Sequence, residues 1–394
     1  MTDADTGTSK RRTIQDIASA AGVSTASVSY ALNGKPGVSD VTRARILAIA
    51  REHNWEPNHQ AQALHSARTD VIGFVIPANN AALSEEPFWI QFISGLEQAL
   101  RVRGRSLLLH TEEHVKVEMD IYRSWRNRNV VDGVVLTDLR PDDARIPMLQ
   151  EIGLPAILAG KPDPDLGLSY CFASDYDDML GLMDYLHGLG LRTFARVVGD
   201  PSYVFVRDRE AAAASFLQEH GLPPLVTAEA GFLSEEALLG AIETLLTVRP
   251  RPQVIIADSD LLAVRTLHAV QARGLMVPDD IQIVSFDDSS ICRLVTPAIT
   301  SLERRPSTVG HAAGKLIVDI PVEQEIITVQ PAAIRARGTT RALRLVSRAG
   351  ATAPRSCRAT PPPRGAAVRI PPTSWCQRRS KRSLRMRADE GTGV

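Results

Sequence analysis

The sequence predicts an all-helical helix-turn-helix domain followed by an α/β core of two lobes, each built on a doubly wound parallel sheet. Two helix patterns joined by a tight turn fall within the first sixty residues. From Val71 onward, apolar strands alternate with amphipathic helices for about 270 residues, a pattern typical of doubly wound α/β folds. That stretch is too long for one sheet, so we expect two similar lobes, and 394 residues leave room for two or three domains.

The composition is that of a soluble globular protein, with 44% hydrophobic and 23% charged residues. The formal net charge is zero, but the charges are unevenly distributed. Residues 10–68 are net basic, the middle of the chain is net acidic, and the end is strongly basic. The basic N-terminal segment is compatible with a surface that binds nucleic acid.

Neither metal binding nor membrane insertion is indicated. The four cysteines, Cys171, Cys292, Cys357 and Cys376, are far apart and form no CxxC pair, so we expect no zinc site and no disulfide framework. The acidic N-terminus lacks the apolar core of a signal peptide. No apolar run approaches the roughly 18 residues that span a membrane. We therefore expect a cytoplasmic protein with no metal, no cofactor and no membrane partner.

The N-terminal domain begins with a helix that Thr13 caps and Gly22 ends. Its apolar stripe consists of Ile14, Ile17, Ala18 and Ala21. A second helix follows, because Ser24 can cap its start and Asn33-Gly34 can adopt the left-handed conformation at its end. A third helix is expected from Ser39 to about Asn54. Its apolar side holds Ile46, Leu47, Ile49 and Ala50, and its basic side holds Arg43, Arg45 and Arg51.

The second helix has the surface of a DNA-reading helix. One face carries Val23, Val28 and Leu32, and the other carries Thr25, Ala26, Ser29 and Tyr30. A helix whose exposed face is small and hydrogen-bonding can enter the major groove of DNA. A generic three-helix cap is the alternative, but the tight turn at residues 21–24 and the basic surroundings favour a helix-turn-helix.

Residues 57–69 form a linker that Pro57 can open as a helix. Its one large apolar side chain is Leu64, and a helix this short is marginal in water. On composition alone the segment is a plain linker, although a leucine on a helix that touches DNA can act as a minor-groove wedge.

The core alternates strands with helices. Strands are expected at residues 71–77, 106–109, 133–136, 155–159, 194–198, 254–257 and 282–286, and helices at about 88–103, 117–128, 175–188, 208–219 and 261–274. We place the crossover between the lobes at Leu166-Gly167-Leu168.

Ligands of open parallel sheets bind at the carboxyl ends of the strands, so the residues that follow each strand are candidates for a pocket. These are Asp138, Lys161, Asp258, Ser259, Asp260, Asp287 and Asp288, with Arg207 and Arg209 at the start of a following helix. Any one of them could be a helix cap or a solvated charge. Together they describe a carboxylate-rich cleft with one or two arginines, to which Phe88 and Trp89 could add an apolar wall. Such a cleft suits a neutral polyhydroxylated ligand such as a sugar, because carboxylates accept hydrogen bonds from hydroxyls and arginine donates to oxygens.

Signals of other functions are missing from the sequence. No GxGxxG follows the first strand and there is no phosphate loop, which argues against a dinucleotide cofactor. No Ser/His/Asp or metal-spaced cluster stands out, so we expect no catalytic residues and no enzyme activity. A solute receptor on the same core would have no use for a helix-turn-helix.

Several motifs resemble those of a known family. Residues 13–18 (TIQDIA), 21–24 (AGVS), 27–34 (SVSYALNG), 38–39 (VS) and 57–58 (PN) closely resemble the DNA-binding part of the lactose/galactose-repressor (LacI/GalR) family of bacterial regulators. Residues 131–135 (VDGVV), 258–263 (DSDLLA), 285–288 (SFDD) and 296–301 (TPAITS) look like its effector domain. The resemblance implies a DNA-binding headpiece, a hinge helix that folds on DNA, and a two-lobed, periplasmic-binding-protein-like core. That core dimerises and binds a small effector between its lobes.

By position, the resemblance places Thr25, Ala26 and Tyr30 at the base-reading positions of the recognition helix. Thr13, Ser24, Ser29 and Asn33 fall among phosphate-contacting or capping positions, and Asn58, Ala61 and Leu64 belong to the hinge. Leu64 matches the leucine that wedges into the minor groove at the operator centre, which replaces the plain-linker interpretation. The predicted effector-binding residues are Phe88, Trp89, Asp138, Lys161, Arg209, Ser259, Asp260 and Asp287. Of these, Arg209 and Asp287 match the pair that grips the effector in many members.

The sequence departs from the family pattern at four positions. Tyr30 stands where Arg or His is frequent, which points to a different operator half-site. Ala26 can offer only an apolar contact, for instance with a thymine methyl. Ser259 stands where Asn is usual, and Ala213 replaces an aromatic that often follows the effector arginine.

The predicted organisation has five parts. Residues 1–12 form a disordered N-terminus, 13–56 the helix-turn-helix domain, 57–69 the hinge helix or linker, 70–340 the two-lobed effector-binding and dimerisation domain, and 341–394 a basic Pro/Arg-rich tail. We expect the tail to be disordered. It is either an added non-specific DNA-binding tail or the frame-shifted or read-through end of a GC-rich gene, and we favour the second. Resequencing the 3′ end separates the two.

We therefore expect a homodimeric, ligand-responsive regulator. The simplest form is a repressor of carbohydrate-use genes that a small sugar effector releases from a pseudo-palindromic operator on double-stranded DNA. A purine-type co-repressor is the alternative within this class, because the wall of Phe88 and Trp89 could stack a base as readily as a sugar face.

Overall fold

The computed structural model describes residues 13–32, 34–53, 55, 68–76, 87–230, 234–321 and 323–343. The chain forms two compact units, divided between Thr69 and Asp70. Several predictions fall outside the described residues: the N-terminal segment 1–12, Asn33, the hinge residues Asn58, Ala61 and Leu64, and the tail from residue 344.

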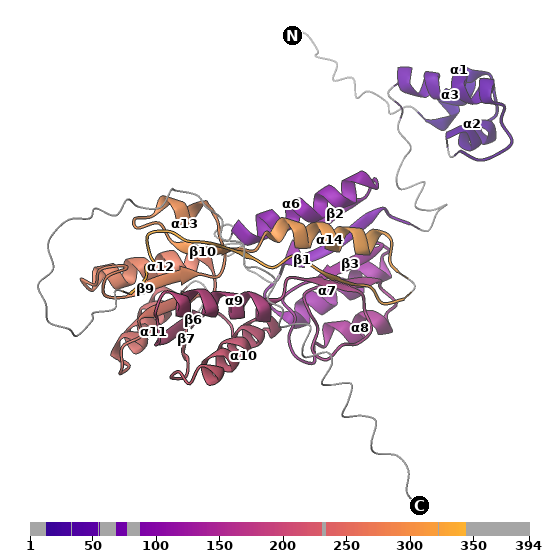
Figure 1. The fold of residues 1–394 in the computed structure, drawn as a ribbon. Coiled ribbons are helices and arrows are strands. Elements are labelled where there is room, and N and C mark those ends of the chain that lie inside the picture. Colours follow the sequence, from indigo (N-terminus) through magenta and orange to yellow (C-terminus); the bar gives the residue numbers. More distant parts are fainter. Residues whose placement is uncertain are drawn as a thin grey trace, which may run out of the picture. The chain divides into compact units, whose positions relative to one another are not determined.

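The N-terminal unit is a domain of three helices (Figure 1). The first, α1 (Ile14–Ala21), ends at Gly22, whose φ of 64° is the left-handed conformation that glycine adopts without strain. Next, α2 (Thr25–Leu32) begins after Ser24, whose Oγ accepts a hydrogen bond from the Ser27 N–H at 3.1 Å. The third, α3 (Asp40–Glu52), follows the Ser39 cap. The predicted order helix, turn, helix is confirmed.

The core of this domain takes one fully buried side chain from each helix, namely Ile17, Val28 and Ile46. The predicted apolar side of α3 is partly wrong, because Leu47 is 37% exposed. Residues 46 and 50 already fill the space between the three helices, so the next position along α3 faces outward.

The second unit contains two six-stranded sheets, one in each lobe (Figure 1). The first lobe takes β1 (Val71–Ile76), α6 (Pro87–Val102), β2 (Ser106–Thr111), α7 (Val115–Asn127), β3 (Gly133–Leu136), α8 (Arg145–Glu151), β4 (Ala156–Ala159) and β5 (Tyr170–Phe172). The second lobe takes α9 (Asp175–Gly188), β6 (Phe194–Val198), α10 (Val204–Glu219), β7 (Val226–Glu229), α11 (Glu235–Thr247), β8 (Val254–Ala257), α12 (Asp260–Ala272), β9 (Gln282–Ser285), α13 (Ser290–Leu294) and β10 (Thr300–Glu303).

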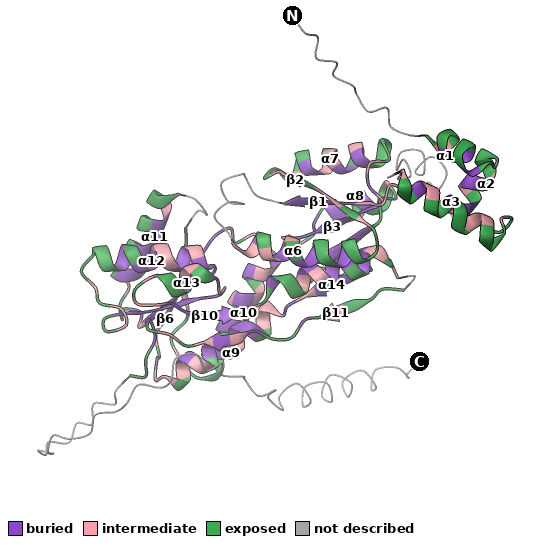
Figure 2. Cartoon of the chain, turned by 90° about the horizontal axis from the view of Figure 1, so that it is seen from above, coloured by how far each residue is buried: buried purple, intermediate pink, exposed green. Residues whose placement is uncertain are grey.

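The last three elements of the second unit are shared between the lobes. Helix α14 (Pro306–Val318) packs on the first lobe, β11 (Ile326–Thr328) pairs with β5 of the first sheet, and β12 (Ala333–Arg335) pairs with β10 of the second. The sheet orders are β11-β5-β4-β3-β1-β2 and β12-β10-β9-β8-β6-β7. All described strand pairs are parallel except β10 with β12. Each lobe is therefore the predicted α/β layer structure, and Figure 2 shows central strands such as β1 and β3 as buried and the outer faces of the helices as exposed.

The predicted crossover at residues 166–168 is wrong. These residues precede β5, which still belongs to the first sheet, so the chain crosses only after Phe172. The short strand β5 was missed because three residues carry too little periodicity to register as a strand. The chain also crosses between β10 and α14 and between β11 and β12, so three connections join the lobes within the described residues.

Helices α6 and α14 lie side by side on the first lobe (Figures 1 and 2). Their close approach depends on glycine, because a Cβ added at Gly310 would lie 2.1 Å from the carbonyl oxygen of Phe92. A Cβ at Gly95 would lie 1.9 Å from the carbonyl oxygen of Ser307. Among the described helices, none combines the length and the apolar character that crossing a membrane requires.

Candidate functional site

The predicted DNA-reading residues share an exposed face of α2. Thr25 and Ala26 are exposed, and Tyr30, the one large side chain of the set, is 44% exposed. Gly37 follows α2 and leaves room for the Tyr30 ring, since a Cβ there would lie 3.3 Å from Cδ2 of the ring. Thr13 and Ser24 are also exposed, and Ser29 is half-buried. The opposite face of the helix packs into the domain core through Val28 and Ala31.

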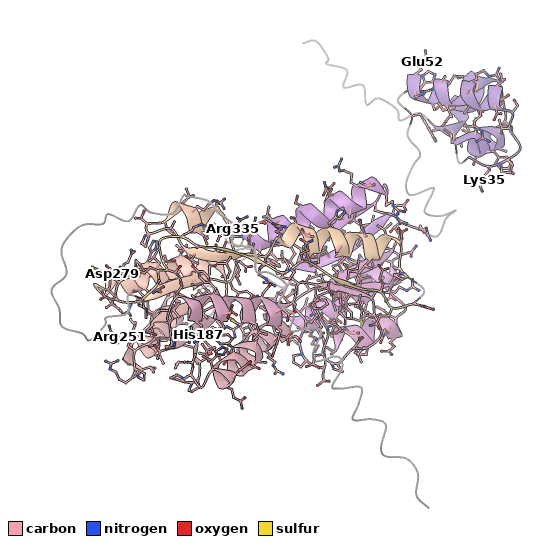
Figure 3. The ribbon with its side chains drawn as sticks, viewed as in Figure 1. Lys35, Glu52, His187, Arg251, Asp279 and Arg335 are labelled. Carbon is pink, nitrogen blue, oxygen red and sulfur yellow. The ribbon has the colours of Figure 1, made fainter. Side chains whose placement is uncertain are left out.

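Arg43, which the sequence placed on a basic face of α3, instead supports the end of α2. Its Nη1 donates to the carbonyl oxygens of Tyr30 at 3.3 Å and Ala31 at 3.1 Å, and its Nη2 donates to that of Lys35 at 2.7 Å. Lys35 lies in the loop just after α2 (Figure 3). The Tyr30 carbonyl also accepts from the Lys35 N–H at 2.9 Å, so Arg43 adds to the hydrogen bonds that hold the helix end carrying Tyr30.

A cavity of about 620 Å³ lies between the lobes of the second unit. All eight predicted effector-binding residues line it, namely Phe88, Trp89, Asp138, Lys161, Arg209, Ser259, Asp260 and Asp287. Trp89 is only 4% exposed, so most of its surface packs in the core of the first lobe. Two weaker candidates lie elsewhere: Arg207 is exposed, and Asp288 binds the side chains of Arg337 and Ser301.

The cavity residues meet because parallel strands end at the same edge of each sheet. Asp138 follows β3 and Lys161 follows β4 in the first lobe, whereas Asp287 follows β9 in the second. Ser259 caps α12, and its Oγ accepts a hydrogen bond from the Leu262 N–H at 3.3 Å. Asp260 is the first residue of that helix.

Arg209, predicted to grip the effector, is already bound to two carboxylates. It is 2% exposed, its Nη2 lies 2.7 Å from Asp175, and its Nη1 lies 3.2 Å from Asp258. Its guanidinium carbon lies 3.8 Å from the ring centre of Phe286 and 4.8 Å from that of Phe205. The protein thus fixes this arginine before any ligand arrives.

Sequence reasoning missed several cavity residues. Asp175 and Arg304 come from two of the lobe crossings, and Arg304 Nη2 lies 2.9 Å from the same Asp175 oxygen that Arg209 binds. Arg140, Tyr203 and Phe205 come from loops or helix starts. A usable signal was Pro306, because a proline that can open a helix marks Arg304 as a residue of the loop just before that helix.

Residues 13–58 match the model of the lacI family of bacterial regulatory proteins, and residues 183–342 match a periplasmic binding protein-like domain. The HTH-type transcriptional regulator CelR of Thermobifida fusca is 30% identical over 316 residues, which cover 79% of this chain and 92% of that protein. The chain belongs to the lacI family. It is therefore a DNA-binding transcriptional regulator.

Other members of the lacI family align over similar lengths. The ribose operon repressor of Bacillus subtilis is 29% identical over 337 residues, covering 84% of this chain and 98% of that protein. A solved structure of a CelR–cellobiose complex superposes with a TM-score of 0.64 at 26% identity, covering 84% of this chain and all of that one. The Lac repressor dimer bound to operator and the anti-inducer ONPF shares the fold, with a TM-score of 0.71 at 23% identity and the same coverage.

Each lobe of this lacI-family regulator has a fully buried arginine beneath the cavity. In the first lobe, Arg145 is 1% exposed and its Nη2 donates to the carbonyl oxygens of Thr137 and Asp138, both at 3.0 Å. Its charge is matched by Glu118 at 3.0 Å and Asp143 at 2.7 Å. These bonds fix the loop that carries Asp138, whose φ of 46° is unusual for a residue with a side chain.

The second lobe repeats this arrangement. Arg196 lies in the middle of β6 with no exposed surface, and it binds Asp258 through Nε at 2.7 Å and Glu210 through Nη1 at 3.0 Å. Asp258 in turn binds Arg209, so Arg196 positions the charged cavity wall indirectly. Removing one partner of such a buried pair leaves the other charge buried and uncompensated, which is strongly destabilising. Both arginines are therefore structural supports of the site.

Two cavity carboxyls of the regulator have pKa values raised close to neutrality. Burial raises the pKa of Asp138 to about 7, although Arg145 and Arg140 oppose this effect. Burial likewise raises the pKa of Asp287 to about 6, against the opposing effect of Arg304. Both carboxyls therefore change charge near neutral pH. The described residues contain no group of three or more His, Cys, Asp or Glu side chains placed to hold a metal ion.

Proposed function

We propose that this regulator is a repressor of carbohydrate-use genes that a small sugar effector releases from a pseudo-palindromic operator. The observation that carries the proposal is the cavity between the lobes, whose wall combines carboxylates with aromatic rings. Carboxylates accept hydrogen bonds from sugar hydroxyls, and the rings can pack on the apolar face of a sugar. The similarity to CelR, solved with cellobiose, supports the same ligand class.

The proposed response is a population shift between two arrangements of the lobes. A ligand that touches both lobes favours the arrangement in which its contacts are complete, and it shifts the equilibrium only by its differential affinity. A change from mostly bound to mostly released operator requires about 5 kcal/mol of such difference. This regulator would then act by binding alone, without catalysis, in the cytoplasm on nucleoid DNA.

We also propose a homodimer, since a pseudo-palindromic operator requires two headpieces. Large apolar side chains are exposed on the first lobe, including Ile90 and Val102 of α6 at 61% and 76% and Leu109 of the edge strand β2 at 41%. Light scattering of the purified chain tests this proposal, and a monomer at the concentration of operator binding contradicts it.

Operator recognition is tested with DNA selected from a random pool by the full-length protein. Tyr30→Ala should weaken binding of the selected site while leaving binding of unrelated DNA unchanged, because base contacts carry sequence discrimination. Leu64→Ala tests the proposed hinge wedge in the same assay. Unchanged operator affinity for both variants contradicts the proposed DNA-binding residues.

The effector is tested by calorimetry against a panel of mono- and disaccharides and purines. A sugar that binds should also release the selected DNA in a gel-shift titration. Arg209→Ala should abolish this response and leave DNA binding intact, whereas the matched variant Arg207→Ala, at an exposed position on the same helix, should leave both intact. Binding of purines in place of sugars supports co-repression by a purine and contradicts the sugar proposal.

A further inference from the structure

The charges that line the cavity are unbalanced. Nine acidic side chains contribute to its wall but only four basic ones, namely Arg140, Lys161, Arg209 and Arg304. Two of the nine, Glu113 and Glu229, are exposed to solvent, but a neutral ligand leaves the other seven carboxylates in excess over the four basic groups in a partly desolvated space. Such an excess is costly, because nearby like charges raise one another's free energy when water is removed.

The three arginines do not relieve the excess, because the protein already uses them. Arg209 binds Asp175 and Asp258. Arg304 lies between Asp175 at 2.9 Å and Asp287 at 3.6 Å. Arg140 binds Asp200 at 3.2 Å. The wall therefore presents many hydrogen-bond acceptors and few free donors.

Four of the acidic residues remain without an ion pair or side-chain hydrogen bond to any described residue: Glu113, Asp138, Asp208 and Glu229. Asp138 is the best placed of them. Arg145 holds its backbone carbonyl, so the position of the residue is fixed while its carboxylate stays unbound. The raised pKa of Asp138 reflects a burial that no protein cation fully offsets.

Two aromatic rings, those of Tyr203 and Phe205, line the cavity near Asp138. Tyr203 lies close enough for the Asp138 charge to raise the pKa of its phenol, after the larger effect of burial. The Tyr203 ring stacks with that of Phe205 at a centroid distance of 5.4 Å, and both line the cavity. Cations of the protein already lie over these rings, with Arg140 4.6 Å from the centre of Tyr203 and Arg209 4.8 Å from that of Phe205. A cation on the ligand would therefore meet the Asp138 carboxylate and not an aromatic face.

A hydroxyl both donates and accepts, whereas an ammonium donates three hydrogen bonds and accepts none. An acceptor-rich wall with few free donors is therefore more complementary to an ammonium. We propose that the effector is a sugar-like polyol that carries a protonated amino group, and that Asp138 receives this group. The inference rests on the proposed function, since it specifies the sugar that the cavity binds.

A matched set of three disaccharides tests the inference by calorimetry with the full-length protein at neutral pH. The set consists of cellobiose, the β-1,4-linked dimer of glucosamine, and the N,N′-diacetylated form of that dimer. These share one scaffold and differ at the 2-position in carrying a hydroxyl, an amine or a neutral amide. We expect the amine to bind at least about tenfold more tightly than cellobiose, since a charge-assisted hydrogen bond contributes on that scale. The diacetylated form should lose this advantage.

Asp138→Asn keeps the shape of the side chain and removes its charge. In this variant the affinity for the amine should lie within about threefold of the affinity for cellobiose. The control Asp142→Asn, which changes an exposed carboxyl on the same loop, should still bind the amine more tightly than cellobiose. Equal or tighter binding of cellobiose by the wild-type protein overturns the inference but leaves the sugar proposal standing. An amine preference that survives in Asp138→Asn overturns the role of Asp138. Binding of none of the three, with purines bound instead, overturns the sugar proposal and the inference with it.

Discussion

Arg140 of the first lobe forms an ion pair with Asp200 of the second, with 3.2 Å between Nη2 and Oδ2. The same guanidinium donates through Nε to the Ser202 hydroxyl at 3.2 Å and lies 4.6 Å from the centre of the Tyr203 ring. Next to it, the Val204 N–H donates to the Leu139 carbonyl oxygen at 2.9 Å. These contacts join the two lobes beside the cavity at a place separate from the three chain crossings.

Arg140→Ala should therefore weaken effector binding by about three- to tenfold, because the arrangement that binds becomes less populated. A partly exposed pair of this kind contributes about 1 kcal/mol or less by itself, and the ring and hydroxyl contacts add to it. Calorimetry with an effector found in the sugar panel gives the affinity, and hydrogen exchange of residues 199–206 reports the Leu139–Val204 bond without ligand.

The double variant Arg140→Ala/Asp200→Ala separates a link between lobes from direct ligand contact. If Arg140 acts through Asp200, the double variant should bind the effector about as tightly as whichever single variant has the lower affinity. Additive losses would instead show that each side chain contacts the ligand. Arg123→Ala, which removes an exposed pair with Asp120 within α7, serves as the control.

Asp138 should make the stability of the protein depend on pH. Its pKa rises from an ordinary value of 3.8 to about 7 on folding, so the folded state binds its proton more tightly than the unfolded state does. The stability that this proton contributes is complete below about pH 4 and is lost as pH rises through about 7. Asp138→Asn lacks the titrating group, so it should gain stability relative to wild type across this window.

Urea unfolding at about pH 5 and pH 8 measures this effect. The difference between Asp138→Asn and wild type should be larger at the higher pH, by up to a few kcal/mol at about 1.4 kcal/mol per pKa unit. The difference in unfolding free energy between Asp142→Asn and wild type should be the same at both pH values. A pH-independent difference for Asp138→Asn would mean that the carboxyl ionises normally in the folded protein.

The sequence was sufficient for those parts of the fold and site that depend on local pattern. Strand and helix periodicity placed the long elements, and residues directly after strands became cavity residues because parallel strands share an edge. Leu47 and Arg43 show the limit of this reasoning. By sequence pattern alone, Leu47 looks like the other apolar residues of α3, and Arg43 looks like its other basic residues. Packing of α3 against α2 nevertheless leaves Leu47 exposed and brings Arg43 to the end of α2.

The missed cavity residues have a common cause. Asp175 and Arg304 belong to crossings between lobes, and Arg140 meets Asp200 only after both lobes have folded. Pairs so distant in sequence leave no periodic signal. Short strands such as β5 and β10 define where the crossings fall. The first has only three residues, and the second has a single apolar residue, Leu302, so neither shows the apolar run by which the predicted strands were identified.

Arg43→Ala should loosen the end of α2 and thereby weaken operator binding. The variant leaves the carbonyls of Tyr30, Ala31 and Lys35 without their shared donor, which should destabilise this helix end by about 1 kcal/mol or more. Hydrogen exchange of residues 28–36 should accelerate about fivefold or more, since that free energy corresponds to this factor. Arg45→Ala, at an exposed position on the same helix, should leave exchange unchanged. Equal exchange in wild type and Arg43→Ala would show that the three bonds do not hold α2.

Gly310→Ala should destabilise the second unit, because α6 and α14 touch through their backbones. The added methyl would lie 2.1 Å from the Phe92 carbonyl oxygen, and backbone atoms cannot move aside as a flexible side chain does. The cost should be about 1–3 kcal/mol or more, seen as a lower midpoint of thermal unfolding. Gly240→Ala is the matched control, because Gly240 lies within α11 with open space around its Cβ position. That variant should gain up to about 1 kcal/mol from helix propensity. Because α14 begins two residues after Arg304, Gly310→Ala should also weaken effector binding. Unchanged stability and binding would mean that the two helices can separate without disturbing the site.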